Sequence, residues 1–343
     1  MHIETKSLNL ALQGGGAHGA FTWGVLERLL ADERIRVRGI SGTSAGAVNG
    51  VLLASGLLEG GPERAQAKLE AFWRRVSYET RPPLLLDSVS DLVAAAGDQI
   101  RDASTAAFDI ASRFFSPYQF NALDYNPMRA ILEELVDFGA LRRQLSIRIY
   151  IAATDVASGG RRVFQTKHLT VEAVLASACL PQLSQAVKVG ARHYWDGGFT
   201  ANPLLLPLVL ESNAQDTLLV QLIPTMDPEL PRNPQEIRER LGRIVFSGPL
   251  RSEVELIELG RTLAAERSIF KGRLHKRFAE HRFHLIDAGL HTQSLAPGSR
   301  LNPERKLILD LRNGGAHAAE TWLEKHLGDV GTRATVDLRD RFL

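Results

Sequence analysis

Gly42-Thr43-Ser44-Ala45-Gly46 places a serine between two glycines, directly after a segment with the pattern of a strand. This segment, Ile35–Ile40, predicts a strand, and the small residues of Ala45–Ser55 predict a helix. Two glycines suit a sharp strand-to-helix turn, because side chains at those positions would collide with the adjoining backbone. Such a turn exposes the serine, and the N-terminus of the next helix favours negative charge beside it. The stretch predicts a nucleophilic Ser44, and an ordinary turn with Ser44 as helix N-cap is the alternative.

A second motif, Gly14-Gly15-Gly16-Ala17-His18-Gly19, stands between a predicted strand at Ser7–Leu12 and a predicted helix at Ala17–Leu30. Consecutive glycines leave backbone N–H groups unobstructed at a helix start, which makes an anion site. In acyl transfer that anion is the tetrahedral oxyanion, and one donor contributes about 10²–10³ in rate. The N–H of Ala45, directly after the serine, is the natural second donor.

The same glycines also match G-x-G-x-x-G, the pattern of a dinucleotide-binding loop. That fold needs an acidic residue at the end of the second strand, where it binds the ribose hydroxyls. Here the second strand ends in Gly39-Ile40-Ser41-Gly42, and Asp32 and Glu33 come before it. The sequence therefore favours an oxyanion loop over a nucleotide site.

A third motif, Trp195-Asp196-Gly197-Gly198, is followed by Asn202-Pro203. Two glycines after an acid let the chain reverse tightly, so that the carboxylate of Asp196 can approach another loop. Alone, an acid followed by two glycines is usually a turn. Together with the other two motifs it predicts a catalytic carboxylate.

The remaining pattern alternates strands and helices, which predicts an α/β fold with a parallel sheet. Further strands are expected at Ile147–Ala153, Arg161–Gln165, Gln185–Val189 and Thr217–Ile223. Further helices are expected at Pro127–Val136, Val171–Ala178, about Pro234–Ala279 and about Asn302–Leu327.

One segment, Tyr78–Tyr125, departs from this alternation because it is continuously amphipathic and helical in pattern. It is interpreted either as a helix pair that completes the core or as a cap over the active site that meets lipid.

The composition is that of a globular protein, with 343 residues, 44% hydrophobic, 23% charged and a net charge of +2. This near balance gives no indication of nucleic-acid binding. The single cysteine, Cys179, excludes an internal disulfide and a cysteine-based metal cage. The sequence starts without a signal peptide's apolar region, and no run of about 18 apolar residues predicts a membrane span. A cytoplasmic protein is expected.

In order and flanking structure, the three motifs resemble the patatin-like phospholipase family. Ala176-Ser177-Ala178-Cys179-Leu180-Pro181 before the acid and Asn202 after it also match that family, and the resemblance covers about residues 7–210. It implies a three-layer α/β/α sandwich with a mostly parallel central sheet. One domain, 1–343, would hold a catalytic core at about 7–212, a helical insertion at 78–125 near the active site and a C-terminal helical extension at about 233–343.

For the chemistry, the resemblance implies a Ser–Asp dyad, with Ser44 as nucleophile and Asp196 as its base. Gly14, Gly15 and Gly16, with the Ala45 N–H, would form the oxyanion hole. The family uses no metal or cofactor and cleaves acyl esters of phospholipids, lysophospholipids or neutral lipids, and some members transfer the acyl group. Since a free aspartate has a pKa near 3.9, burial must raise the pKa of Asp196 for it to serve as a base.

His18 is a departure, because many family members carry Arg or Lys at this place in the glycine loop. An unperturbed histidine titrates near pH 6.5, so any charge from His18 would depend on pH. A packing or capping role is equally compatible with the sequence, and His18 is not predicted to be catalytic.

The Ser–Asp dyad has two alternatives. A Ser–His–Asp triad would need a histidine after Asp196, and those available lie mostly in charged, helical sequence that suggests the surface: His275, His281, His284, His291, His317 and His326. A non-catalytic lipid-binding or regulatory protein on the same fold is disfavoured, because all three motifs are intact.

A basic run predicts either a solvated helix face or a contact with anionic lipid headgroups. Its members are Lys271, Arg273, Lys276, Arg277 and Arg282, with His275 and His281. The sequence leaves homodimerisation open.

Overall fold

The computed structural model describes residues 5–79, 116–121, 124–265, 272–293, 295 and 298–343. Most of the predicted insertion at 78–125 therefore lies outside the described residues. Within it, the short helix α5 (Pro117–Phe120) is described.

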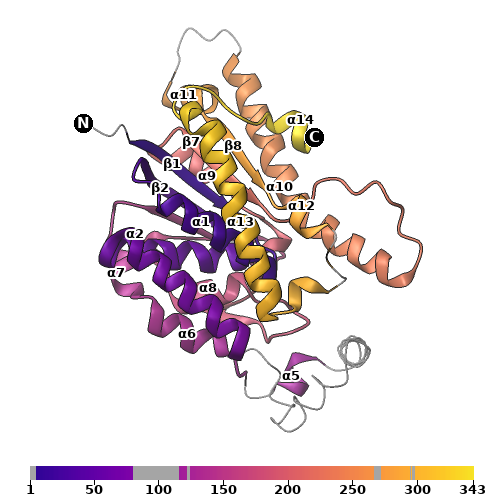
Figure 1. The fold of residues 1–343 in the computed structure, drawn as a ribbon. Helices are drawn as coiled ribbons and strands as arrows, with labels where there is room; N and C mark the ends of the chain where they lie inside the picture. Colours follow the sequence, from indigo (N-terminus) through magenta and orange to yellow (C-terminus); the bar gives the residue numbers. More distant parts are fainter. Residues whose placement is uncertain (1–4, 80–115, 122–123, 266–271, 294, 296–297) are drawn as a thin grey trace.

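A mostly parallel sheet of eight strands forms the centre of the described structure, in the order β5-β6-β3-β2-β1-β7-β8, with β4 also paired to β3 (Figure 1). Parallel pairing joins β3, β2, β1, β7 and β8, while β4 and β6 run antiparallel to β3. The strands are β1 (Lys6–Leu12), β2 (Ile35–Gly42), β3 (Arg148–Asp155), β4 (Arg161–Gln165), β5 (Val187–Val189), β6 (Arg192–Asp196), β7 (Asp216–Gln221) and β8 (Arg282–Asp287).

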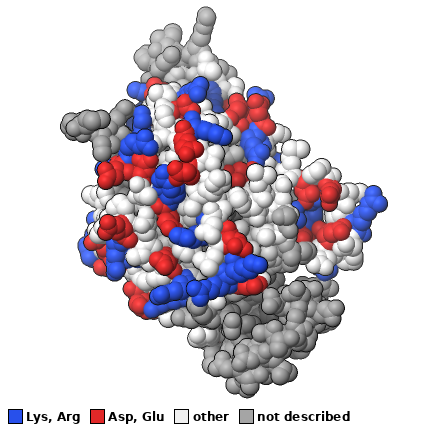
Figure 2. All heavy atoms as spheres, in the orientation of Figure 1, with Lys and Arg blue, Asp and Glu red and all other residues white. Residues whose placement is uncertain are grey.

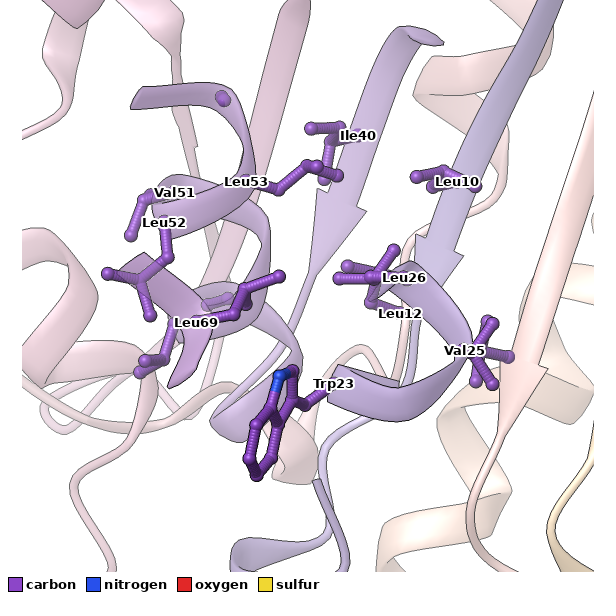
Figure 3. Close-up of a cluster of buried hydrophobic side chains, with 14 of the residues drawn as sticks. Leu10, Leu12, Trp23, Val25, Leu26, Ile40, Val51, Leu52, Leu53 and Leu69 are labelled. Atoms are coloured by element: carbon purple, nitrogen blue, oxygen red, sulfur yellow. The ribbon is translucent and has the colours of Figure 1, made fainter. Parts of the chain in front are cut away.

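Both faces of the sheet are buried, because successive strand residues enter two different cores. In β1, Leu10 and Leu12 join one core while Ala11 between them joins the other. Side chains from β1, β2, α1 and α2 interdigitate in the first core (Figure 3). This period-2 alternation with apolar residues on both faces is typical of a sheet covered by helices on each side. The predicted α/β/α sandwich is confirmed.

Two groups of helices supply the outer layers. The first core contains residues of α1, α2, α6, α8 and α13, and the second contains residues of α9, α10 and α14. The longer helices are α1 (Gly19–Leu30), α2 (Ala45–Glu79), α6 (Pro127–Leu135), α10 (Pro234–Ala265), α11 (Arg273–Glu280) and α13 (Arg305–His326). The shorter ones are α7 (Phe138–Arg143), α8 (Val171–Ser177), α9 (Leu206–Glu211), α12 (Gly289–Thr292) and α14 (Leu338–Phe342), with 3₁₀ turns η1 (Gly16–His18), η2 (Thr166–His168), η3 (Gly197–Phe199), η4 (Ser299–Leu301) and η5 (Leu327–Asp329).

Two strands were missing from the prediction. β6 was not expected, and β8 lies inside the segment interpreted as a helical extension over 233–343. Both begin with an arginine, and each carries a histidine that weakens the apolar pattern. In β8 that residue is His284, which is fully buried because Asp216 of β7 satisfies its ring nitrogen at 3.1 Å. The placement of His281 and His284 on the surface was therefore wrong.

Acidic and basic side chains are interspersed over the face shown in Figure 2, in keeping with the small net charge. Among the described helices, none is both long enough and apolar enough to cross a membrane.

Candidate active site

The sheet register brings the predicted serine turn and the predicted acid together. On β3, Ile151 pairs with Gly42 at the end of β2, and Ala153 pairs with Asp196 at the end of β6. Because β4 occupies the other edge of β3 over the same residues, β2 and β6 must share one edge. The turn that leaves β2 and the carboxylate that ends β6 are consequently neighbours, although they lie far apart in the sequence.

Ser44 occupies the sharp turn that the two glycines predicted. Its φ of 55° lies in the left-handed region, which non-glycine residues rarely adopt. The Ser44 N–H donates to Ser177 Oγ at 2.9 Å, and the Thr43 hydroxyl donates to the Ala201 carbonyl at 2.7 Å. A Cβ at Gly46 would collide with the Leu12 carbonyl oxygen, so only glycine lets the helix start this close to β1. The surrounding chain therefore holds the turn in its strained conformation.

Asp196 is fully buried at the end of β6. Its Oδ1 accepts the Gly198 N–H at 2.7 Å, while no hydrogen-bond partner of good geometry is present for Oδ2 among the described residues. Two hydrogen bonds fix the backbone of Asp196. Its N–H donates to the Cys179 carbonyl, and its own carbonyl accepts the Thr154 hydroxyl. One carboxylate oxygen thus orients the side chain and the other remains available.

Burial raises the pKa of Asp196 from its ordinary value near 3.8 to about 7. The Gly198 N–H and the Ser44 side chain oppose this shift, because both favour the ionised form. The burial effect predominates because, among the described residues, no cationic side chain forms an ion pair with this carboxylate. The predicted increase in basicity is confirmed in direction.

The glycine loop lies directly against the serine. A Cβ at Gly14 would be 2.8 Å from Ser44 Cβ. The Gly14 N–H itself donates to Asn202 Oδ1 at 2.7 Å, so its assignment as an oxyanion donor is corrected. No acceptor is found within the described chain for the N–H groups of Gly15, Gly16 and Ala45. The candidate oxyanion donors are these three.

A second layer of polar residues fixes this loop, and sequence reasoning missed part of it. Gln13 accepts the N–H groups of Leu222 and Ile223 at 2.7 and 2.8 Å, and it donates to the Asn202 carbonyl at 3.1 Å. Asn202 in turn donates to the Phe246 carbonyl of α10 at 3.0 Å. The available signal in the sequence is a polar glutamine placed directly between an apolar strand and three glycines.

His18 carries no charge at neutral pH. Burial and the nearby Arg300 lower the pKa of His18 to about 4, and His18 Nε2 lies 2.9 Å from Ser299 Oγ. The cation near the loop is instead Arg300 of η4, whose carbonyl would collide with a Cβ at Gly16, a residue with φ of 58°. Burial lowers the pKa of Arg300 to about 10, so the guanidinium stays protonated.

The other motif glycines are also tightly packed. A Cβ at Gly42 would lie 2.5 Å from the Gly46 carbonyl oxygen, and one at Gly19 would lie 2.6 Å from Ala45 Cβ. A Cβ at Gly197 or Gly198 would collide with the Ala152 carbonyl or the Phe246 ring, respectively. Each motif glycine thus permits a close approach between two segments of the site.

Two buried histidines and the single cysteine do not compete for this role. His281 directly precedes β8 and His284 lies near its start, whereas Ser44 follows the end of the parallel strand β2. Burial raises the pKa of Cys179 to about 12, so its thiol is unreactive. Within the described residues, no group of three or more His, Cys, Asp or Glu could hold a metal ion.

A family model shows which family the chain belongs to. The family model described as Patatin-like phospholipase matches residues 10–209, which span the glycine loop, the serine turn and the acid. A search of curated proteins gives no significant match. Among solved structures, the crystal structure of VipD from Legionella pneumophila is similar, with 14% identity, a TM-score of 0.40, and coverage of 94% of this chain and 67% of VipD. The chain belongs to the patatin-like phospholipase family and is a lipid acyl hydrolase.

Proposed function

We propose that the protein cleaves carboxylic esters of lipids through a Ser44–Asp196 dyad. The Ser44 hydroxyl oxygen attacks the ester carbonyl carbon while Asp196 Oδ2 takes its proton. The tetrahedral intermediate then expels the alcohol, which receives that proton, and an acyl-enzyme remains. Water then attacks the acyl-enzyme while Asp196 takes its proton. The second tetrahedral intermediate expels Ser44, which receives that proton, and the fatty acid is released. The observation that carries this proposal is a buried carboxylate oxygen that no other described residue satisfies, beside a serine held at a strained turn.

The pKa of about 7 answers the main physical objection to an aspartate base. A base is most effective when its pKa lies near the working pH. Fixed proximity of the two groups removes the entropic cost of bringing them together. Asp196 can therefore accept the Ser44 proton and return it to the leaving alcohol without a histidine.

Oxyanion stabilisation is assigned to Gly15, Gly16 and Ala45. Their N–H groups have no acceptor in the part of the chain that the structure describes. For Ala45 this is expected, because the first turn of an α-helix leaves its N–H groups without intrahelical partners. Each donor aimed at the developing negative charge contributes about 10²–10³ in rate. Gly14 contributes by position, since its hydrogen bond to Asn202 anchors the loop.

The lipid character of the substrate is supported by α10 as well as by family membership. Four of its side chains form an exposed apolar stripe at helical spacing: Ile237, Leu241, Ile244 and Val245 are 44%, 56%, 56% and 43% exposed. The next residue, Phe246, packs on Phe199 with ring centroids 5.0 Å apart and abuts Gly198 beside the acid. The stripe thus leads toward Asp196 on the part of α10 that projects from the molecule (Figure 1).

We assign this stripe to contact with a lipid surface, which would place the protein at the periphery of a membrane. A cytoplasmic location is part of the proposal and rests on the sequence alone. The single catalytic domain would include β7 and β8, which belong to the same sheet as β1. The alternative is that two copies of the chain associate through this stripe.

A lipid-product mass spectrum tests the proposal. Phospholipid, lysophospholipid and triglyceride are offered together, and Ser44→Ala is the blank. Free fatty acid that requires both Ser44 and Asp196 is expected. A folded protein that neither releases fatty acid nor reacts at Ser44 with a fluorophosphonate would instead support the non-catalytic lipid-binding account.

A further inference from the structure

A polar cavity lies at the end of the sheet opposite to Ser44. Its volume is about 570 Å³, and three of its lining residues, Lys6, Asp216 and Arg282, begin the adjacent strands β1, β7 and β8. Ser44, in contrast, follows the last residue of β2, which runs parallel to β1. Since a strand rises about 3.3 Å per residue, the length of the sheet separates this cavity from the catalytic dyad.

The cavity has a surplus of positive charge. Five lining residues are basic and one is acidic: Lys6, Arg273, Lys276, Arg277 and Arg282 against Asp216. That acid is already neutralised, because Arg282 lies 2.8 Å from one of its oxygens and His284 lies 3.1 Å from the other. Lys276 also pairs with Glu280 of the same helix at 3.9 Å. Apart from Asp216, the described lining contains no carboxylate, so Arg273 and Arg277 leave it with a surplus of positive charge.

The cations on α11 are close enough to oppose one another. Burial and the charge of Arg273 both lower the pKa of Arg277, which stands one helical turn later. Like charges at this spacing destabilise a helix unless an anion lies between or above them. Arg277 is held in place by donating to the carbonyls of Val209 and Ser212 at 3.1 and 2.7 Å, so the charge cannot simply swing away.

We propose that this cavity binds the phosphate groups of a multiply charged ligand. Its lining is largely polar, with Ser212, Asn213, Gln215 and Thr332 among the cations, which suits a phosphorylated group and not an acyl chain. A volume of about 570 Å³ matches an ordinary small-molecule site. The shared chemistry is a phosphorylated headgroup, whether on a soluble molecule or on a lipid. This inference does not depend on the catalytic mechanism.

The test measures binding to the full-length protein by titration calorimetry and by vesicle sedimentation. Pyrophosphate and inositol trisphosphate are the soluble probes, and phosphatidylcholine vesicles with and without a phosphoinositide are the lipid probe. In the double variant Arg273→Gln, Lys276→Gln, binding should weaken by about 10-fold or more, because each cation contributes about a factor of five. Both side chains are exposed, so the fold should survive.

The matched control is Arg251→Gln, Lys325→Gln, which removes one exposed arginine and one exposed lysine from other helices. The affinity of this control for each probe should stay within about twofold of the parent's, because salt screens exposed charges that lie far from the cavity. Binding of soluble probes alone identifies a soluble ligand, and added binding to phosphoinositide vesicles identifies a lipid headgroup. Absence of binding by every probe, or equal weakening in the control, would overturn the proposal.

Discussion

Two buried aspartates stand at opposite ends of the sheet and differ in almost everything except burial. Asp196 ends β6 and is 0% exposed, and Asp216 begins β7 and is 3% exposed. Asp216 is surrounded by partners: Arg282, His284 and the Gly331 N–H all contact it. Asp196 accepts one backbone N–H at Oδ1, and within the described part of the chain Oδ2 has no hydrogen-bond partner of good geometry.

The pKa values follow the partners and not the burial. Burial raises both, but hydrogen bonds from His284 and Arg282 hold the pKa of Asp216 well below its usual range. At Asp196 only the uncharged Gly198 N–H and Ser44 side chain oppose burial, and the pKa rises to about 7. One environment makes an aspartate a permanent structural anion, and the other makes it a base. A buried carboxylate becomes a functional candidate when it lacks a cation.

The largest effect is expected from exchanging the base for an amide. Asp196→Asn keeps the acceptor for Gly198 but removes the proton acceptor, so the rate of lipid hydrolysis should fall by about 10²–10⁴. Asp216→Asn, assayed well below its melting temperature, should keep most of the activity. Equal losses in the two variants would erase the functional distinction between the two acids.

Stability should respond in the opposite sense. Asp216→Asn leaves Arg282 and His284 without their anion, which should lower the free energy of unfolding by about 3 kcal/mol. Since the folded pKa is depressed, this stabilisation is present above the unfolded value and is lost as pH falls. Urea unfolding at neutral pH measures the effect, with exposed Asp310→Asn on α13 as control. A loss no greater than that of the control would contradict the assignment.

Asp196 should cost stability at high pH. Its folded pKa is about 7, above the unfolded value of 3.8, so the folded state holds an extra proton between these values. Stability therefore falls as pH rises through this window. Asp196→Asn should raise the free energy of unfolding at pH 8 by about 2 kcal/mol, and by much less at pH 4. An increase that is the same at both pH values would point to packing and not to charge.

A smaller loss is expected from loosening the glycine loop. Asn202→Ala leaves the buried Gly14 N–H without its acceptor, which should lower kcat/KM by about 10-fold. The exposed Asn313→Ala serves as the matched control. Steady-state kinetics at one pH compares kcat/KM of the two variants with that of the parent. An unchanged kcat/KM in Asn202→Ala would show that Asn202 does not support the glycine loop.

The smallest effect is predicted at His18. Because its pKa is about 4, the ring is neutral where the enzyme works, and His18→Gln should change activity by only about threefold. The pH profile of the variant should match that of the parent. A lost or shifted ionisation near pH 6.5 would show that His18 does carry charge.

The sequence was sufficient for the parts of the molecule that depend on local pattern. Ser44 and its flanking glycines predict the turn, and the apolar runs predict β1, β2 and β7, because sharp turns and buried parallel strands have strong local signatures. The three motifs predict Asp196 as a catalytic carboxylate, and the family resemblance supplies its role as the base of Ser44. Its position beside Ser44 follows from β2 and β6 sharing an edge of β3, which no local pattern specifies.

What could not be predicted depends on contacts between distant segments. The Gly14 N–H was assigned to the oxyanion, but Asn202 occupies it. The histidines of β8 look like surface residues until Thr217 and Asp216 are brought beside them. Polar residues are buried only when a partner elsewhere satisfies them, so their placement is a property of the fold.

The central claim, that Asp196 is the base of Ser44 and titrates near neutrality, is tested most directly by the pH dependence of Ser44 labelling. The second-order rate of reaction with a fluorophosphonate is measured from pH 5 to pH 9, a probe that needs no knowledge of the natural ester. The account predicts a rate that rises through a single ionisation with an apparent pKa of about 7. That ionisation should disappear in Asp196→Asn. A rate that is independent of pH over this range, or an ionisation that survives in Asp196→Asn, would contradict it.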